Sequence, residues 1–249
     1  MKKWFVTVCV IATLFGSVVA QNKVTLTSLD WPPYSGKTLI DQGASIAVAK
    51  AAFKAMGYDL TVEFYPWERA VGMAKTEARI AGYFPEYYSA DNAKDFIYSA
   101  PMGEGPLGFV ERKDDPIAWT TLNDLKMVTI GTVSGYVNTD EFDAKVDKKE
   151  LKVEAVVDDI TNLKKLINKR IKLAVIDKNV MNYLLKNDPS VSANKNDLQF
   201  NSKPLENKKL YICFKKGPEG QKLTTIYNDG LKKINVQQIM NDYFAKIGK

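Results

Sequence analysis

KKLYICFKKGPEGQKLTTIYNDGLKKI, residues 208–234, decides the fold of this chain. Leu210–Phe214 is apolar enough for a strand, a Gly-Pro turn follows, and apolar residues then recur at the spacing of an amphipathic helix. The next stretch, QQIMNDYFAKIG (237–248), predicts another helix. This tail matters because it follows two stretches that each already predict a complete α/β unit.

Each of those two stretches predicts the order strand, helix, strand, helix, strand. The first consists of Val24–Ser28, Gly43–Gly57, Leu60–Tyr65, Trp67–Lys75 and Ile80–Phe84. The second consists of Met127–Ile130, Val137–Val146, Leu151–Val157, Asp159–Lys169 and Ile171–Ile176. Alternation of this kind is typical of parallel sheets covered by helices, so the chain is expected to form two α/β lobes.

The tail does not fit the second lobe, so we expect Leu210–Phe214 to cross back to the first. Crossings near Gly108–Arg112 and near Leu210–Phe214 would together form a hinge. The predicted boundaries are 21–110 and 210–249 for lobe one and 111–209 for lobe two.

Residues 1–20 have the layout of a cleavable secretory signal peptide. Lys2 and Lys3 precede an apolar run, and small residues precede Gln21. The run is too short to span a bilayer comfortably, and Cys9 lies inside it, which argues against a lipoprotein. We therefore expect a soluble protein exported to the periplasm, with Cys213 as its one remaining cysteine and no intramolecular disulfide.

The charge pattern argues against nucleic acid as a partner. The formal net charge is +6 at pH 7, and +4 without Lys2 and Lys3. Scattered lysines supply most of it, because only four of the 35 basic residues are arginines: Arg69, Arg79, Arg112 and Arg170. Nucleic-acid surfaces usually cluster their basic residues and use arginine forks, so a solvated surface is the better interpretation.

Catalytic machinery is sparse in this sequence. The chain has no histidine, which excludes Ser-His-Asp and Cys-His arrangements and the HExxH zinc site, and it has no GxxxxGK phosphate loop. Carboxylate or lysine chemistry stays open, although no spacing demands it. We expect no catalytic residue, no metal and no cofactor.

The strand ends indicate where a ligand would bind, because ligands of open α/β sheets lie beyond the carboxyl ends of the strands. These ends carry Trp31–Tyr34, Pro66–Arg69 and Tyr83–Tyr88 in lobe one, and Gly131–Tyr136, Asp158 and Asp177 in lobe two. Aromatic residues gather on one lobe and carboxylates on the other. A cationic or amine-bearing small molecule between the lobes would suit both sets.

Each of these residues also has a structural interpretation. Trp31, Tyr34 and Trp67 could be core residues, although the Pro-Pro turn between the first two favours a preset surface. The segment GTVSGY (131–136) is either a tight turn or the start of a helix whose free N–H groups bind an anion. Asp177 is equally suited to cap a helix and to contact a ligand.

Motifs along the chain resemble those of the periplasmic extracellular solute-binding proteins of family 3, the amino-acid type that serves ABC transporters. They are DWPPYSG (30–36), PWERA (66–70), YYSADNAKDFIYSAPM (87–102), IGTVSG (130–135), KLAVIDKNV (172–180), LYICFKKGPEG (210–220) and IMNDYFAKIG (239–248). No single motif is specific, but their order over some two hundred residues is. The resemblance implies an α/β, two-lobed type II periplasmic binding protein fold, joined by a two-strand hinge, that closes around a small solute for a membrane permease.

By this resemblance, Trp31 matches the aromatic that stacks on the ligand, and Asp177 matches the carboxylate that receives the ligand's α-amino group. Asn92 departs from the pattern, because it stands where the family has the arginine that binds the α-carboxylate. Either Arg69, which follows a lobe-one strand end, replaces that arginine, or the ligand is not a standard α-amino acid. The candidate ligand-binding residues are Trp31, Tyr34, Trp67, Arg69, Tyr87, Asn92, Ser134, Tyr136 and Asp177.

Three functions fit these observations. The main expectation is a monomeric binding protein that captures a small polar solute, an amino acid or a related amine or acid, for an ABC transporter permease. One alternative is an enzyme on the same scaffold, since cyclohexadienyl dehydratases resemble this fold, and turnover would reveal it. The other is a ligand-responsive sensor component, which would have a membrane receptor as its partner in place of a permease.

Overall fold

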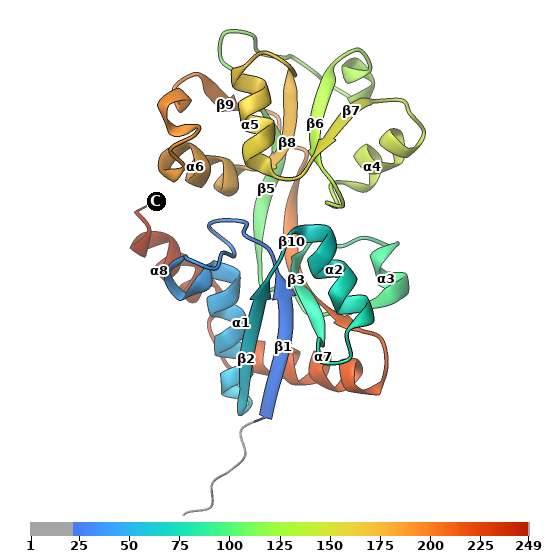
Figure 1. Ribbon diagram of the computed structural model, residues 1–249, viewed down its shortest axis with the longest axis vertical. Helices are drawn as coiled ribbons and strands as arrows, with labels where there is room; N and C mark the ends of the chain where they lie inside the picture. Colours follow the sequence, from blue (N-terminus) through green and yellow to red (C-terminus); the bar gives the residue numbers. More distant parts are fainter. Residues whose placement is uncertain (1–21, 249) are drawn as a thin grey trace, which may run out of the picture.

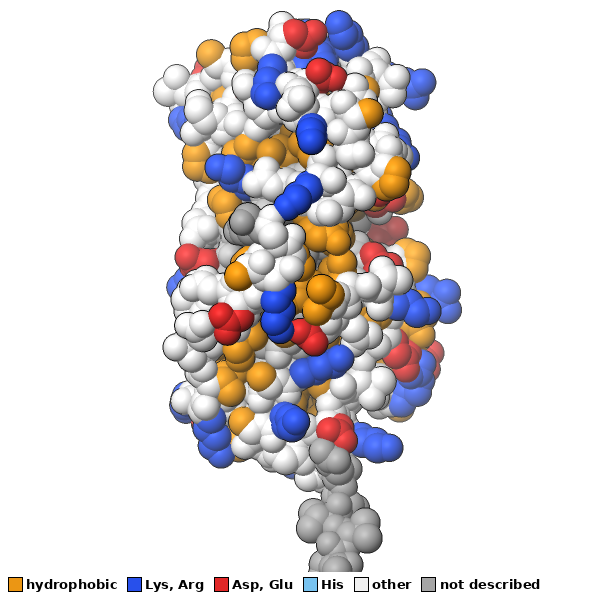
Figure 2. All heavy atoms as spheres, turned by 90° about the vertical axis from the view of Figure 1, so that its left-hand side faces the viewer, with side chains coloured by type: hydrophobic (Ala, Val, Ile, Leu, Met, Phe, Trp, Pro, Cys, Tyr) orange, Lys and Arg blue, Asp and Glu red, His pale blue; other side chains and the backbone are white. Residues whose placement is uncertain are grey.

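Two lobes stacked along the long axis make up the molecule in the computed structural model, which describes residues 22–248 (Figure 1). The signal-peptide prediction concerns residues 1–20 and so lies outside the described residues. No helix within the described range is long and apolar enough to cross a membrane. Figure 2 shows basic and acidic side chains interspersed over one face of the molecule, with neither sign gathered into a patch.

The first lobe is built on parallel strands in the order β2-β1-β3, with β10 antiparallel to β3 at their edge. Its strands are β1 (Asn22–Ser28), β2 (Tyr58–Phe64), β3 (Gly82–Glu86) and β4 (Phe96–Tyr98). Its helices are η1 (Ile40–Gln42), α1 (Ala44–Ala55), α2 (Trp67–Thr76), α3 (Asn92–Asp95), α7 (Pro218–Leu231) and α8 (Val236–Lys246).

The apolar face of α1 anchors the core of this lobe. Ile46, Ala49 and Phe53 recur at helical spacing and are fully buried. Helices α7 and α8 pack against α1, which brings the C-terminal end of the chain onto the N-terminal lobe as the tail sequence predicted (Figure 1).

The second lobe repeats the same plan, with parallel strands in the order β7-β6-β8 and antiparallel β5 beside β8. Its own strands are β6 (Thr129–Val133), β7 (Lys152–Val156), β8 (Leu173–Asp177) and β9 (Leu198–Phe200). Its helices are η2 (Leu122–Leu125), α4 (Asp140–Asp147), α5 (Asp159–Ile167), α6 (Lys178–Asn187) and η3 (Ser192–Asn194).

Two long strands, β5 (Gly103–Arg112) and β10 (Glu206–Lys215), connect the lobes and run antiparallel to each other. Beyond their shared segment, β5 continues into lobe two against β8, and β10 continues into lobe one against β3 and β4 (Figure 1). Each strand therefore belongs to both lobes, and the two predicted crossings are present. The exact lobe boundaries stay a prediction.

Helix α4 begins later than the sequence predicted. It starts at Asp140 rather than Val137, because the Thr139 hydroxyl caps it by accepting a hydrogen bond from the Phe142 N–H. No range was predicted for α6, although the cap weighed for Asp177 implied a helix there. Helix α6 follows β8 with no intervening loop, so Asp177 is both the last residue of the strand and the cap of the helix.

Candidate functional site

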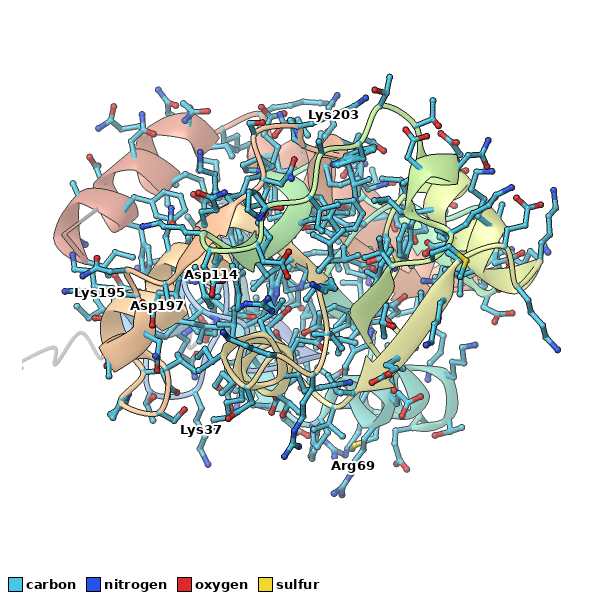
Figure 3. All side chains as sticks on the ribbon, turned by 90° about the horizontal axis from the view of Figure 1, so that it is seen from above. Lys37, Arg69, Asp114, Lys195, Asp197 and Lys203 are labelled. Carbon is cyan, nitrogen blue, oxygen red and sulfur yellow. The ribbon has the colours of Figure 1, made fainter. Side chains whose placement is uncertain are left out.

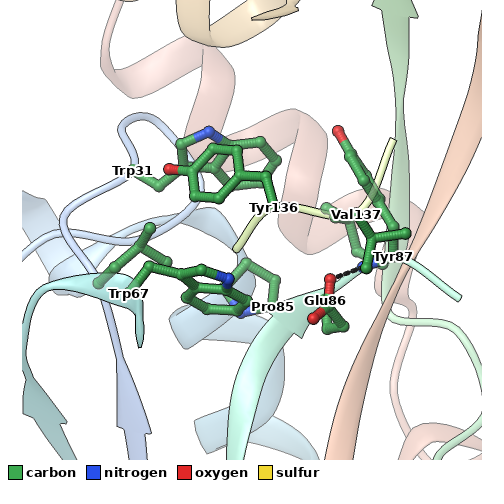
Figure 4. A pocket seen from close by; sticks show the side chains of 9 residues that line it. Trp31, Trp67, Pro85, Glu86, Tyr87, Tyr136 and Val137 are labelled. Carbon is green, nitrogen blue, oxygen red and sulfur yellow. Dashed lines mark hydrogen bonds between the residues drawn. The ribbon is translucent and has the colours of Figure 1, made fainter. Parts of the chain in front are cut away.

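A small pocket lies between the lobes, at the carboxyl ends of the parallel strands (Figure 4). Its cavity volume is about 30 Å³, well below the usual range for small-molecule sites, so its walls lie close together in this arrangement of the lobes. Both lobes contribute to its walls, which are formed by Leu29, Trp31, Trp67, Pro85, Glu86, Tyr87, Tyr136, Val137 and Leu210. The observed position agrees with the expectation for open α/β sheets.

Four of the nine residues that line this pocket are aromatic. The ring of Trp31 stacks on Tyr34, with centroids 4.8 Å apart, and meets the edge of Tyr87 at 5.9 Å. The ring of Trp67 meets Tyr136 of the other lobe edge to face at 5.9 Å. In Figure 4, Trp31 and Tyr136 lie on one side of the pocket, and Trp67 lies with Pro85 on the other.

A tight turn after β1 presets Trp31 and Tyr34. The Trp31 N–H donates to the Ser35 carbonyl at 2.8 Å, and the Tyr34 N–H donates to the Trp31 carbonyl at 3.0 Å. The Ser35 hydroxyl donates back to the Leu29 carbonyl at 2.9 Å. Both rings are almost fully buried, so they are core residues of the closed molecule. Trp31 also lines the pocket, and Tyr34 stacks on Trp31 behind it.

Direct hydrogen bonds hold the two lobes together around the pocket. The indole N–H of Trp67 donates to the Gly135 carbonyl of lobe two at 2.9 Å. The Asn179 amide of α6 donates to the Tyr34 hydroxyl at 2.7 Å. The structure therefore represents the closed arrangement of the lobes.

Asp177 combines both of the roles weighed for it. One carboxylate oxygen caps α6 by accepting from the N–H groups of Asn179 and Val180, at 2.7 and 3.2 Å. The hydroxyls of Tyr34 and Tyr87 in lobe one donate to the same carboxylate at 3.3 to 3.4 Å. Burial raises the pKa of Asp177 to about 7, although these hydrogen bonds oppose the shift.

Asp159, the first residue of α5, is a second buried carboxyl group at the lobe interface. It lies on the far side of Trp31 and Tyr136, in a larger groove between the lobes. Burial raises its pKa to about 7, and the neighbouring charges of Asp158 and Asp177 add to the shift. A hydrogen bond from the Trp31 side chain opposes it.

Glu86 is a pocket residue that the sequence did not single out. It ends β3, is 4% exposed and accepts hydrogen bonds from the Tyr87 N–H at 2.8 Å, the Asn92 amide at 3.0 Å and the Tyr83 hydroxyl at 3.2 Å. Burial raises its pKa to about 8. The available signal in the sequence was its place at the end of a strand.

Seven of the nine candidate ligand-binding residues gather at this site. Trp31, Trp67, Tyr87 and Tyr136 line the pocket, Tyr34 and Asp177 lie directly behind it, and Asn92 contacts Glu86. Their contact with a solute stays a prediction.

Ser134 and Arg69 do not line this pocket. The Ser134 N–H donates to the Val156 carbonyl at 2.8 Å, and α4 begins six residues later. The segment 131–136 is thus a strand end and a turn, which is the first of the two alternatives weighed for it, and not a helix start. Arg69 is exposed, its guanidinium lies 4.8 Å from the centroid of the Tyr65 ring, and Figure 3 shows it pointing away from the molecule.

Lys208 of β10 is a buried basic residue whose charge acts on Glu86. Its ammonium lies 5.7 Å from the centroid of the Tyr87 ring and 3.6 Å from the Glu206 carboxylate. Its charge acts through space to lower the pKa of Glu86, but burial outweighs it. Across the described range, no group of three or more His, Cys, Asp or Glu residues is placed to hold a metal ion.

Comparison with known proteins identifies the fold. No family model matches the chain, and no curated protein matches its sequence. Among solved structures, a histidine kinase sensor domain with similarity to periplasmic binding proteins has a TM-score of 0.75 at 16% identity, over 91% of this chain and 96% of its own. An amino acid ABC transporter substrate-binding protein from Streptococcus pneumoniae, bound to L-arginine, has a TM-score of 0.72 at 16% identity, over 90% and 95%.

A third similar structure is an ancestral amino-acid-binding protein described as a precursor of cyclohexadienyl dehydratase. Its TM-score is 0.70 at 18% identity, over 92% of this chain and 96% of its own. These similarities confirm, at the level of fold, the resemblance to the two-lobed amino-acid-type binding proteins.

Proposed function

We propose that this protein is a periplasmic solute-binding protein, which captures a small polar solute between its lobes and delivers it to the permease of an ABC transporter. The observation that carries the proposal is the pocket itself, because its walls come from both lobes. Trp31, Trp67 and Glu86 belong to lobe one, whereas Tyr136 and Val137 belong to lobe two. A solute in this pocket would favour closure, since the complete set of contacts exists only in the closed arrangement.

The two connecting strands suit this role. Both β5 and β10 continue from one lobe into the other, so a small change of backbone angles between them would open the pocket to solvent. The closing contacts combine hydrogen bonds, such as that from Trp67 to the Gly135 carbonyl, with ring contacts, such as that of Trp67 with Tyr136.

The similar sensor domain supports a second candidate, a component that reports its occupancy to a membrane receptor. Solute capture would be the same in both cases, and the partner would differ. Capture from detergent extracts on the immobilised chain, with and without solute, followed by identification of permease or receptor subunits, separates the two.

The primary test is a thermal-shift and calorimetry screen of the chain from Gln21 to Lys249 against amino acids, amines, polyamines and organic acids. A solute at 100 times its dissociation constant should stabilise the protein by about 2.7 kcal/mol. Scattering with and without that solute should show a smaller radius of gyration when it is bound, for a particle of monomer mass.

A pair of variants makes the screen specific. Trp31→Ala should abolish most of the stabilisation, whereas Trp119→Ala, which changes a half-buried indole of lobe two away from the pocket, should retain it. Absence of any stabilising solute in all four classes, or equal loss in both variants, would contradict the proposal.

A further inference from the structure

We propose that the solute is a small organic cation that carries no carboxylate group, and that Glu86 is the residue that selects for its charge. This inference rests on the proposed function, because it names the class of solute for the same pocket. It follows from three features: an uncompensated buried carboxyl, aromatic faces around it, and the lack of a group that could receive a carboxylate.

The first feature is the missing partner of Glu86. Its three hydrogen-bond donors, on Tyr83, Tyr87 and Asn92, are all neutral. Within residues 22–248, no basic side chain forms an ion pair with Glu86, Asp159 or Asp177. A buried carboxylate without a cation is unfavourable, and a cationic ligand would supply what the protein lacks.

The groups that face Glu86 from neighbouring elements give it no ion-pair partner. Lys208 of β10 is the basic residue that acts on it, and this ammonium is shared with Glu206. The negative charge of Asp143 in α4 raises the pKa of Glu86, whereas the charge of Lys208 lowers it. Tyr83 and Asn92 carry no charge, so the neighbours do not neutralise Glu86.

The second feature is the set of aromatic walls. Trp31, Trp67 and Tyr136 come from separate elements of both lobes and surround the space next to Glu86 (Figure 4). Aromatic faces attract ammonium and methylated ammonium groups, and the attraction is stronger where water is excluded. A cation with an apolar body would therefore gain from the rings and from the carboxylate at the same time.

The third feature is the lack of a receptor for a carboxylate. No lysine or arginine lines the pocket among the described residues, and the amide of Asn92 already donates to Glu86. The turn at the end of β6 does not present the N–H groups of Ser134 and Tyr136 to a carboxylate, because both donate to backbone carbonyls. A carboxylate in the ligand would meet Glu86 as a like charge without compensation.

Matched pairs of amino acids and their decarboxylated amines test the inference directly. Calorimetry at pH 8 would compare agmatine with arginine, cadaverine with lysine, phenethylamine with phenylalanine, and tetramethylammonium with glycine betaine. At least one cation should bind, and it should bind at least tenfold more tightly than its carboxylate-bearing partner. Tighter binding of the carboxylate-bearing member would overturn the inference but leave solute binding intact. No binding by any solute in the larger screen would contradict the proposed function itself.

Variants of the pocket assign the selection to Glu86. Glu86→Gln keeps the size of the side chain and should lower the affinity for the best-bound cation at least tenfold. Glu219 is an exposed acidic residue of α7, and Glu219→Gln should leave this affinity unchanged. From pH 6 to pH 8 the affinity of the natural protein relative to that of Glu86→Gln should increase as Glu86 ionises, because the opening that Asp177 causes is common to both proteins. An unchanged affinity in a folded Glu86→Gln variant would refute the role of Glu86.

A gain-of-function variant keeps the test informative if Glu86→Gln folds poorly. Asn92→Arg places a guanidinium beside Glu86 at the half-buried start of α3. This variant should bind the cation at least tenfold more weakly and should bind the parent amino acid more tightly than the natural protein does. Tight cation binding that survives in the folded Asn92→Arg variant would count against the inference.

Discussion

Raising the pH should open the ligand-free protein, because closure buries carboxyl groups that have no cationic partner. Asp177 makes the clearest case. It belongs to lobe two, and in the closed structure the hydroxyls of Tyr34 and Tyr87 from lobe one cover it, with the Asp159 carboxyl nearby. Burial raises the pKa of Asp177 from its ordinary value of 3.8 to about 7.

The size of the effect follows from this shift. Between pH 3.8 and pH 7 the closed form keeps a proton on Asp177 that the open, solvated form loses, so raising the pH through this window favours opening. Each pH unit within the window contributes about 1.4 kcal/mol. From pH 5 to pH 8 about two such units are crossed, which gives about 3 kcal/mol, or roughly a hundredfold shift toward the open form.

Small-angle scattering of the ligand-free chain at pH 5 and pH 8 is the assay. The radius of gyration of the natural protein should be larger at pH 8. Asp177→Asn should reduce that difference, because asparagine caps α6 equally well and cannot ionise. Asp140→Asn, which removes an exposed charge in the first turn of α4, should behave like the natural protein. An equal radius at both pH values, or an undiminished pH dependence in Asp177→Asn, would refute the reasoning.

Three further predictions concern the pocket, the hinge and the core. Trp31→Ala and Asp177→Ala should each weaken solute binding at least tenfold in calorimetry, while circular dichroism stays close to that of the natural protein. Gly105→Ala should destabilise the fold by about 1–3 kcal/mol in urea unfolding, because the added Cβ would lie 2.1 Å from an Asp177 carboxylate oxygen and 2.3 Å from the Tyr34 hydroxyl. Gly72→Ala in α2, where a Cβ meets nothing within 4 Å, is the matched control and should not destabilise. The thiol of Cys213, buried and with its pKa well above the ordinary value, should react with a thiol reagent in the chain from Gln21 only after unfolding; rapid reaction of the native protein would contradict its burial.

The alternation of strands and helices was readable from the sequence because it depends on local periodicity. The apolar spacing of Ile46, Ala49 and Phe53 predicted α1, and these residues are buried as one face. The return of the tail was also readable, since a strand and two helices remained after both lobes were complete. Helix starts were less certain, because the cap at Thr139 depends on a single hydrogen bond.

The side chains that reach the pocket depend on the tertiary structure. The sequence placed Trp31, Trp67 and Asp177 at strand ends, and that was sufficient to bring them to the lobe interface, because the carboxyl ends of parallel strands share one edge. It could not show that Arg69 turns outward over Tyr65, since the direction of a side chain on a helix depends on how that helix packs.

Glu86 and Tyr136 also show that the sequence alone did not predict how acidic and aromatic residues are divided between the lobes. The sequence suggested aromatics on one lobe and carboxylates on the other, but Glu86 comes from lobe one and Tyr136 from lobe two. Local periodicity sets which residues lie at the ends of strands. The pairing of those ends across the hinge, and the burial that raises the pKa of Glu86, depend on contacts between residues far apart in the chain, which only the folded and closed molecule decides.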